Sequence, residues 1–373
     1  MTDQQKPDLL ALDPEELAAL MESLGEARYR AKQLFEGMHR GLAPEEISTL
    51  GKRLAARLRE ETLWVMPTVD TKLVSAIDGT VKYLFRLWDG NCVESVIMRY
   101  EHGNTICISS QVGCRMGCRF CASTIGGKVR DLSAGELLGQ VLAAQRDVGE
   151  RISNIVMMGI GEPLDNYENV VRFLRLVNRP EGIKIGYRHI SLSTCGLVDR
   201  IRELAREEMP ITLSISLHAP DDETRSSIMP VNRRFGVDEL LNACRDYYAV
   251  TGRRISFEYT LIAGKNDSPE AAEKLAQVLN AHLRSRTETM PIHVNLIPVN
   301  PVKETGFTPA ARDGIRRFAA RLEARGIRAT VRRTLGADIN ASCGQLRRKR
   351  EETKETMAAT EAKETTKATE TAE

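Results

Sequence analysis

Apolar positions in the first sixty residues follow the helical period. From Leu9 to about Leu63 they recur every three or four residues, and this spacing predicts helices that each bury one stripe. The run Asp13-Pro-Glu-Glu16 has the acidic cap and early proline of a helix start. Further helices are expected over 27–38 and 44–61. Residues 1–63 are therefore predicted to form a small helical module.

The pattern then changes to alternating apolar and polar positions. Alternation is clearest in Lys82–Leu87 and Cys92–Met98, and the pairs Asp78-Gly and Asp89-Gly mark turns. A period of two interrupted by Asp-Gly pairs is typical of hairpin strands. Residues 64–100 are therefore predicted to form a β-hairpin extension.

From about residue 105, short apolar runs alternate with longer helical patterns. Strands are expected near 105–109, 152–158, 189–194, 211–217, 254–262, 291–297 and 327–332, and helices near 133–148, 167–178, 197–207, 237–250, 268–284 and 309–325. Short connections between alternating strands and helices favour a parallel sheet covered by helices. We therefore predict an α/β fold in which residues 101–346 form a partial (β/α)6-type barrel. Catalytic groups in barrels lie at the carboxyl ends of the strands.

The last segment, residues 347–373, differs in composition. After Arg350 it consists mainly of Glu, Thr, Ala and Lys, too little apolar bulk to offset the entropy of ordering, so a disordered charged tail is predicted. The seven Glu and three Lys after Arg350 contribute −4 to the chain's net charge of +2, so residues 1–350 carry +6. Arginine concentrates at 316–333 and 347–350, with further basic residues at 28–57. Such patches suit phosphate backbones, although arginine-rich helix faces are often simply solvated.

Composition limits the class of protein. With 42% apolar residues the chain can bury a substantial core. No apolar run approaches the roughly 18 residues that cross a bilayer, and the N-terminus lacks the layout of a secretion signal. These features predict a cytoplasmic protein with no membrane association. In a reducing compartment its eight cysteines indicate metal or redox chemistry rather than a disulfide framework.

Three cysteines share one short run. Cys114, Cys118 and Cys121 have the spacing C-x3-C-x2-C directly after the first barrel strand. Closed zinc or iron–sulfur sites use four protein ligands, whereas three thiolates on a [4Fe-4S] cluster leave one iron open. The spacing resembles the signature of radical S-adenosylmethionine (SAM) enzymes. The alternatives are a zinc site completed by His102 or Cys107, and three unrelated core cysteines.

Polar residues end several predicted strands. The second ends in Gly159-Ile-Gly-Glu-Pro163, where glycines allow a ligand to approach and Glu162 can bind an ammonium group. Pro163 and the missing third glycine argue against a dinucleotide fingerprint, and a plain turn is the alternative. The third, fourth and sixth strands end in Ser191–Thr194, Ser214–His218 and Asn295–Asn300. These ends either face a ligand or satisfy neighbouring backbone groups.

Two further cysteines lie outside the triad. Cys343 is beside a glycine rather than inside an apolar run, and Cys107 is in the strand that leads to the cysteine triad. Both are expected at the barrel mouth, as a reactive thiol pair or in separate packing roles.

Together these motifs resemble the RlmN family of radical SAM RNA methyltransferases. The matching motifs are Cys107–Cys114, the cysteine triad, Gly159–Pro163, Ser216–His218 and Asp338–Gln345. The resemblance extends from the helical module, expected to bind RNA, to Leu346. It implies a radical SAM barrel.

The resemblance also implies residue roles. Cys114, Cys118 and Cys121 are expected to bind the cluster, and Gly161, Glu162, Ser193, Ser216, Leu217, His218 and Asn300 to line the SAM site. Cys343 is expected to carry the methyl group, with Cys107 as its resolving partner and Glu94 as proton acceptor. From its position alone, Glu94 has the pattern of an ordinary exposed strand carboxylate.

The implied reaction adds a methyl group to C2 of an adenine in 23S rRNA and in tRNA. It uses two SAM molecules per turnover, one to methylate Cys343 and one to supply a radical that activates the S-methyl group. A reducing donor such as flavodoxin and a monomeric enzyme are expected. The alternatives are methylation at adenine C8, as in a sister family, and a non-catalytic RNA-binding protein with structural zinc.

Overall fold

A ten-stranded sheet forms the centre of the computed structural model, which describes residues 6–284, 290–300, 306–341, 344, 346–348 and 350. Its strands are β1 (Thr68–Val74), β2 (Val81–Arg86), β3 (Cys92–Tyr100), β4 (Gly103–Cys107), β7 (Ile152–Met157), β8 (Ile190–Thr194), β9 (Thr212–Ser216), β10 (Ile255–Leu261), β11 (Ile292–Pro298) and β12 (Arg328–Val331), neighbours in this order. From β4 to β12 every pairing is parallel. The strands β1 to β4 pair antiparallel. The hairpin region thus continues the barrel sheet.

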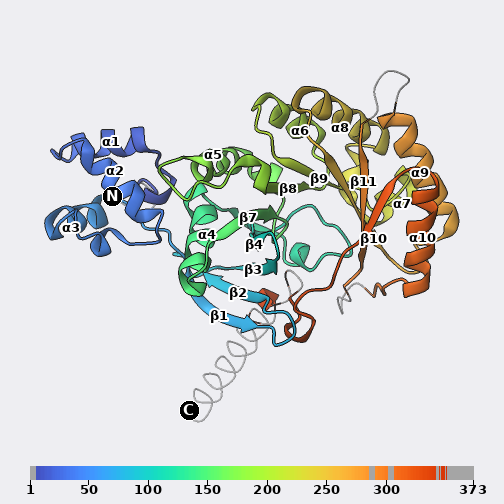
Figure 1. Cartoon of the computed structure of the whole chain (residues 1–373), viewed down its shortest axis with the longest axis horizontal. Helices are drawn as coiled ribbons and strands as arrows, with labels where there is room; N and C mark the ends of the chain where they lie inside the picture. Colours follow the sequence, from blue (N-terminus) through green and yellow to red (C-terminus); the bar gives the residue numbers. More distant parts are fainter. Residues whose placement is uncertain are drawn as a thin grey trace, which may run out of the picture.

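Helices cover the outer side of this curved sheet (Figure 1). They are α4 (Ala134–Val148), α5 (Tyr167–Asn178), α6 (Val198–Arg206), α7 (Asp222–Ile228), α8 (Val237–Thr251), α9 (Pro269–Leu283) and α10 (Arg312–Ala324). Fully buried side chains such as Leu213, Phe257 and Leu296 alternate along the strands with more polar positions, which is how a barrel separates its interior from its helix layer. The predicted α/β fold with a partial barrel of parallel strands is confirmed. Within the described residues β1 and β12 are the sheet's two edges, so the barrel is open.

The helical module lies beside α4 and α5 in Figure 1. It contains α1 (Pro14–Ser23), α2 (Tyr29–Met38), a 3-10 turn over Pro44–Glu46 and α3 (Lys52–Glu61). The prediction of one helix over 44–61 is wrong, because Gly51 has φ +78° and interrupts it before α3. Short elements were also missed: α7, and the strands β5 (Gln111–Gly113) and β6 (Lys128–Asp131).

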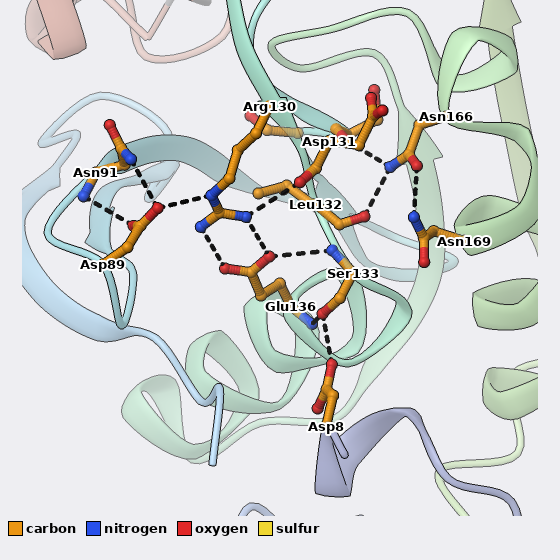
Figure 2. Close-up of polar contacts among 12 residues, drawn as sticks. Asp8, Asp89, Asn91, Arg130, Asp131, Leu132, Ser133, Glu136, Asn166 and Asn169 are labelled. Atoms are coloured by element: carbon orange, nitrogen blue, oxygen red, sulfur yellow. Dashed lines mark hydrogen bonds and ion pairs between the residues drawn. The ribbon is translucent and has the colours of Figure 1, made fainter. Parts of the chain in front are cut away.

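A polar network joins the module, the β2–β3 turn and the start of α4. Figure 2 shows the Arg130 guanidinium between Asp89 and Glu136, and the Asp8 carboxylate against the Ser133 hydroxyl. Ser133 caps α4 and forms a capping box with Glu136. The network fixes β6, and with it one end of the cysteine loop, relative to the rest of the fold.

Candidate active site

A cavity of about 570 Å3 opens at the carboxyl ends of the parallel strands, where barrel chemistry is expected. All three cysteines of the triad line it, as does Cys107. The structure also brings together most of the predicted SAM-site residues: Gly161, Glu162, Ser193, Ser216, His218 and Asn300. Leu217 differs, because its side chain is fully buried in the core and is not among the described lining residues.

The cysteine loop is held closed by its own backbone. The strands β5 and β6 pair antiparallel on its two sides. The Cys114 N–H donates to the Gly127 carbonyl at 3.0 Å, and the Cys121 N–H donates to the Cys118 carbonyl at 3.1 Å. The Thr124 hydroxyl donates to the Cys121 carbonyl at 2.9 Å. The three thiols are therefore fixed on one wall of the cavity.

These thiols suit a soft metal group. Burial raises the pKa of Cys114 to about 12 and also raises the pKa of Cys118. Thiols in such surroundings become thiolates when a metal supplies the compensating charge. Soft sulfur donors of this kind select iron–sulfur clusters, copper(I) or zinc. The predicted fourth zinc ligand His102 stacks on Tyr100 at a centroid distance of 5.1 Å and is not among the described lining residues.

Glu162 is a buried carboxylate at the end of β7. It accepts hydrogen bonds from the Cys195 N–H at 2.7 Å and from the Leu164 N–H at 3.1 Å. Burial raises its pKa. Its neighbour Gly161 has φ +110°, and a Cβ there would lie 2.7 Å from the Gln111 backbone nitrogen. This close approach of two chain segments places the carboxylate on the cavity wall, where a cationic ligand would compensate its burial.

His218 is held in one orientation and one tautomer. It has φ +58°, uncommon for a side chain other than glycine, and its Nδ1 accepts the Thr260 N–H at 2.9 Å. Burial lowers its pKa to about 3, so the ring is neutral near pH 7 and carries its hydrogen on Nε2. The ring also packs edge-on against Phe120, at 4.9 Å between centroids. It can donate one hydrogen bond to a ligand without adding charge.

Glu258 is a cavity residue that was not predicted from the sequence. It lies on β10, lines the cavity, and accepts hydrogen bonds from Asn295 Nδ2 at 2.7 Å and the Ser256 hydroxyl at 3.0 Å. Burial raises its pKa. The only local signal for Glu258 is that a carboxylate interrupts the mainly apolar run Ile255–Leu261; its burial and its Asn295 partner depend on the neighbouring strand.

Glu94 is buried rather than exposed as its strand position suggested. Only 2% of it is accessible, and it pairs with Lys82 at 3.1 Å. Its carboxylate accepts the N–H groups of Gly344 and Arg347 at 2.9 and 2.7 Å. It is not among the described lining residues of the cavity. In this structure Glu94 therefore holds the C-terminal segment.

Cys343 lies outside the described residues. Ala341, which precedes it by two positions, lines the cavity. On its other side, a Cβ at Gly344 would lie 3.2 Å from Ala122 Cβ and from Ser123 N, and both of those residues line the cavity. The described residues Ala341 and Gly344, on either side of position 343, thus both lie at the cavity.

The parallel β/α sheet, with a three-cysteine loop at its carboxyl edge, defines a radical SAM enzyme, and residues 108–276 match the radical SAM superfamily. The chain belongs to the RlmN family of RNA methyltransferases. It is 49% identical over 345 residues to the probable dual-specificity RNA methyltransferase RlmN of Alkaliphilus metalliredigens (strain QYMF), covering 92% of this chain and 96% of the relative. The corresponding protein of Clostridium perfringens (strain 13 / Type A) is 51% identical over 343 residues, or 91% and 96% of the two chains.

A solved structure supports the same family assignment. A radical SAM methyltransferase from Sphaerobacter thermophilus superimposes with a TM-score of 0.85 at 43% identity, covering 91% of this chain and 98% of that one. The predicted family, enzyme class and cofactors are confirmed: the protein is a radical SAM RNA methyltransferase that uses a [4Fe-4S] cluster and SAM. The non-catalytic zinc alternative is thereby excluded. Among the described residues no helix is long and apolar enough to cross a membrane.

Proposed function

We propose that this enzyme methylates C2 of an adenine in 23S rRNA and in tRNA. One observation supports this most directly: Cys107 and Ala341 line the same cavity as the cysteine triad, although they are far apart in the sequence. A thiol pair formed by Cys107 and Cys343 at this cavity suits a reaction in which the methyl group first joins a protein sulfur. An aromatic C2–H is neither acidic nor nucleophilic, so a radical route is needed and the cofactors supply it.

The cysteine triad would hold the cluster, which supplies the one-electron reduction of SAM when bound. The Cys343 thiolate would accept a methyl group from one SAM. After that group loses one hydrogen atom, its carbon would form a carbon–carbon bond to adenine C2. The Cys107 thiolate would then attack the Cys343 sulfur, breaking the bond between this sulfur and the transferred carbon and leaving a disulfide, while the released carbon takes up a proton to complete the methyl group. A reductant is then needed to convert this disulfide back to two thiols before the next turnover.

The remaining site residues would bind SAM. Glu162 would bind the amino group, since a buried carboxylate favours a cationic partner, and the neutral His218 ring would donate a hydrogen bond. Gly161, Ser193, Ser216 and Asn300 line the same wall. Leu217 would act through the strand end it occupies, because its side chain is buried in the core.

Glu94 would accept the C2 proton. Both of its carboxylate oxygens contact the C-terminal segment in this structure, so this role requires the segment to shift when RNA binds. The helical module, assigned to residues 1–63, would bind RNA. The hairpin region (64–100), the catalytic core (101–346) and the tail (347–373) complete the proposed organisation. A flavodoxin-type donor, a monomeric state and a cytoplasmic location remain predictions.

Product analysis of treated RNA tests the proposal. Reconstituted enzyme, SAM, reductant and unmodified 23S rRNA or tRNA should yield 2-methyladenosine by mass spectrometry. Cys107→Ala should trap a protein–RNA crosslink visible as a gel shift, and Cys107→Ala/Cys343→Ala should remove it. Finding 8-methyladenosine, or an equal crosslink yield in the double variant, would contradict the proposal.

A further inference from the structure

Arg225 is the largest fully buried side chain among the described residues, with 0% of it accessible. It lies on α7, and its guanidinium donates only to neutral oxygens. Nε bonds the Leu217 carbonyl at 3.0 Å, Nη1 the Asn232 side chain at 2.9 Å, and Nη2 the carbonyls of Cys195 and Ser216 at 2.6 and 3.1 Å. A buried cation with this set of partners keeps its full charge.

No carboxylate of the described residues forms an ion pair with this guanidinium. The negative charge of Asp222 affects Arg225 only at longer range. The Asp222 carboxylate instead accepts hydrogen bonds from the Val237 N–H and from the Asn232 side-chain amide. Burial lowers the pKa of Arg225. An uncompensated charge in the interior is unfavourable unless another group of opposite sign is bound nearby.

The cysteine loop is the neighbour that can provide such a group. Ile228 and Met229, which follow Arg225, share an apolar cluster with Cys118 and Cys195. The Arg119 N–H donates to the Ile228 carbonyl at 2.9 Å and ties the loop to α7. The guanidinium itself donates to the Cys195 carbonyl at 2.6 Å, and Cys195 belongs to the same cluster as Cys118. The buried positive charge of Arg225 therefore lies on the Cys118 side of the loop.

We propose that Arg225 is an electrostatic positioning residue for the cluster, whose buried positive charge makes one-electron reduction of the cluster easier. The inference rests on the proposed binding of the cluster by Cys114, Cys118 and Cys121. Three thiolates give the assembly a net negative charge, and the electron accepted from the reductant makes it more negative. A cation in a medium of low dielectric constant stabilises the reduced form more than the oxidised form.

The same side chain also holds the ends of β8 and β9, because its Nη2 donates to the carbonyls of both Cys195 and Ser216. A purely structural role would affect folding but would leave the reduction potential unchanged. The potential is therefore the measurement that separates the two roles.

The experiment measures the reduction potential of the cluster. Full-length protein, reconstituted anaerobically and without SAM, is titrated with dithionite, and the reduced cluster is quantified by electron paramagnetic resonance. In Arg225→Gln we expect the equilibrium constant for reduction to fall at least tenfold, which is about 59 mV towards more negative potential for one electron. Arg225→Lys, which keeps the charge, should stay within threefold of wild type. Arg119→Gln is the matched control, because Arg119 adjoins Cys118 but is exposed, and an exposed charge is screened.

A second variant tests the charge without removing Arg225. The double substitution Asp222→Asn/Asn232→Asp keeps the net charge but moves a carboxylate into contact with Arg225 Nη1. It should make the reduction potential of the cluster more negative, as Arg225→Gln does. This arm decides the question if Arg225→Gln fails to fold. Unshifted potentials in cluster-loaded variants, or an equal shift in Arg119→Gln, would overturn the proposal. A different result would contradict the ligand assignment on which the proposal rests: a variant without the three thiols that still binds a full cluster.

Discussion

At Gly113 the backbone enters the cysteine loop with φ +79°, and a Cβ there would overlap the Gly127 carbonyl oxygen. Gly113→Ala should therefore displace the strand pair that closes the loop. We expect the iron bound per chain after reconstitution to fall by more than half. The free energy of unfolding should fall by about 1–3 kcal/mol from the backbone conformation alone, as measured by chemical denaturation.

Gly126→Ala is the control for this prediction. Gly126 lies in the same loop with φ +86°, but a Cβ added to it would have no described atom within 4 Å. The substitution introduces backbone strain without a clash, so iron content should stay near that of wild type. Equal iron loss in both variants would show that the close contact at Gly127 is unimportant.

At the residue scale, most of the site residues that short motifs predicted line the cavity. The cysteine triad, Gly161, Glu162 and His218 each belong to a motif whose chemistry is visible within a few positions. Glu258 and Arg225 were missed, because their meaning depends on partners in other elements. Asn295 binds Glu258 from the neighbouring strand, and the carbonyls that Arg225 binds end two different strands. Burial of a charged group is decided by the tertiary structure and not by local sequence.

At the element scale, the long periodic segments were predicted well. The seven barrel strands and six of their helices were placed to within a few residues, because all of them except β12 bury apolar side chains. The strand β5 has only three residues and the helix α7 only seven, fewer than two full helical turns, so neither shows its own period in the sequence. The split after Pro44–Glu46 was missed because the apolar spacing continues through Gly51, although the backbone does not.

The junction between the helical module and α4 should make stability depend on pH. Burial raises the pKa of Asp8 from 3.8 to about 6, with the Ser133 hydroxyl acting in the opposite direction. A raised folded-state pKa means that the folded form holds the proton more tightly. The resulting stability is complete below pH 3.8 and is lost as pH rises through about 6.

Asp8→Asn should remove this contribution while keeping the shape of the side chain. Between pH 4 and pH 7 the unfolding free energy of wild type should fall by about 2–3 kcal/mol relative to the variant. Urea denaturation of both proteins at the two pH values measures the difference, and the other titrating groups cancel because they are common to both. Parallel pH profiles for the two proteins would rule out the role assigned to Asp8.

At the scale of the whole molecule, the hairpin region fixes the C-terminal segment that leads to Cys343. The Asp338 carboxylate accepts the Ser75 hydroxyl at 2.6 Å and the Ala76 N–H at 2.8 Å, and Asp78 accepts the Gly336 N–H at 2.8 Å. In Figure 1 the red end of the described chain lies beside the turn that joins β1 to β2. These contacts join residues more than 250 positions apart, so no local pattern could have predicted them.

The buried ion pair of Lys82 and Glu94 is the centre of this attachment. Replacing Lys82 alone should lower the free energy of unfolding more than replacing both residues together. Lys82 is 1% accessible, and its ammonium group contacts both Glu94 and the Asn340 carbonyl. Lys82→Met leaves the Glu94 charge buried without its cation, so the unfolding free energy should fall by about 3–5 kcal/mol. Lys82→Met/Glu94→Gln removes that charge and should recover roughly half of the loss, because the amide oxygen can still accept a backbone N–H. Denaturation of the wild type, both single variants and the double variant gives the coupling energy; additive effects would mean that the pair does not hold the segment as a unit.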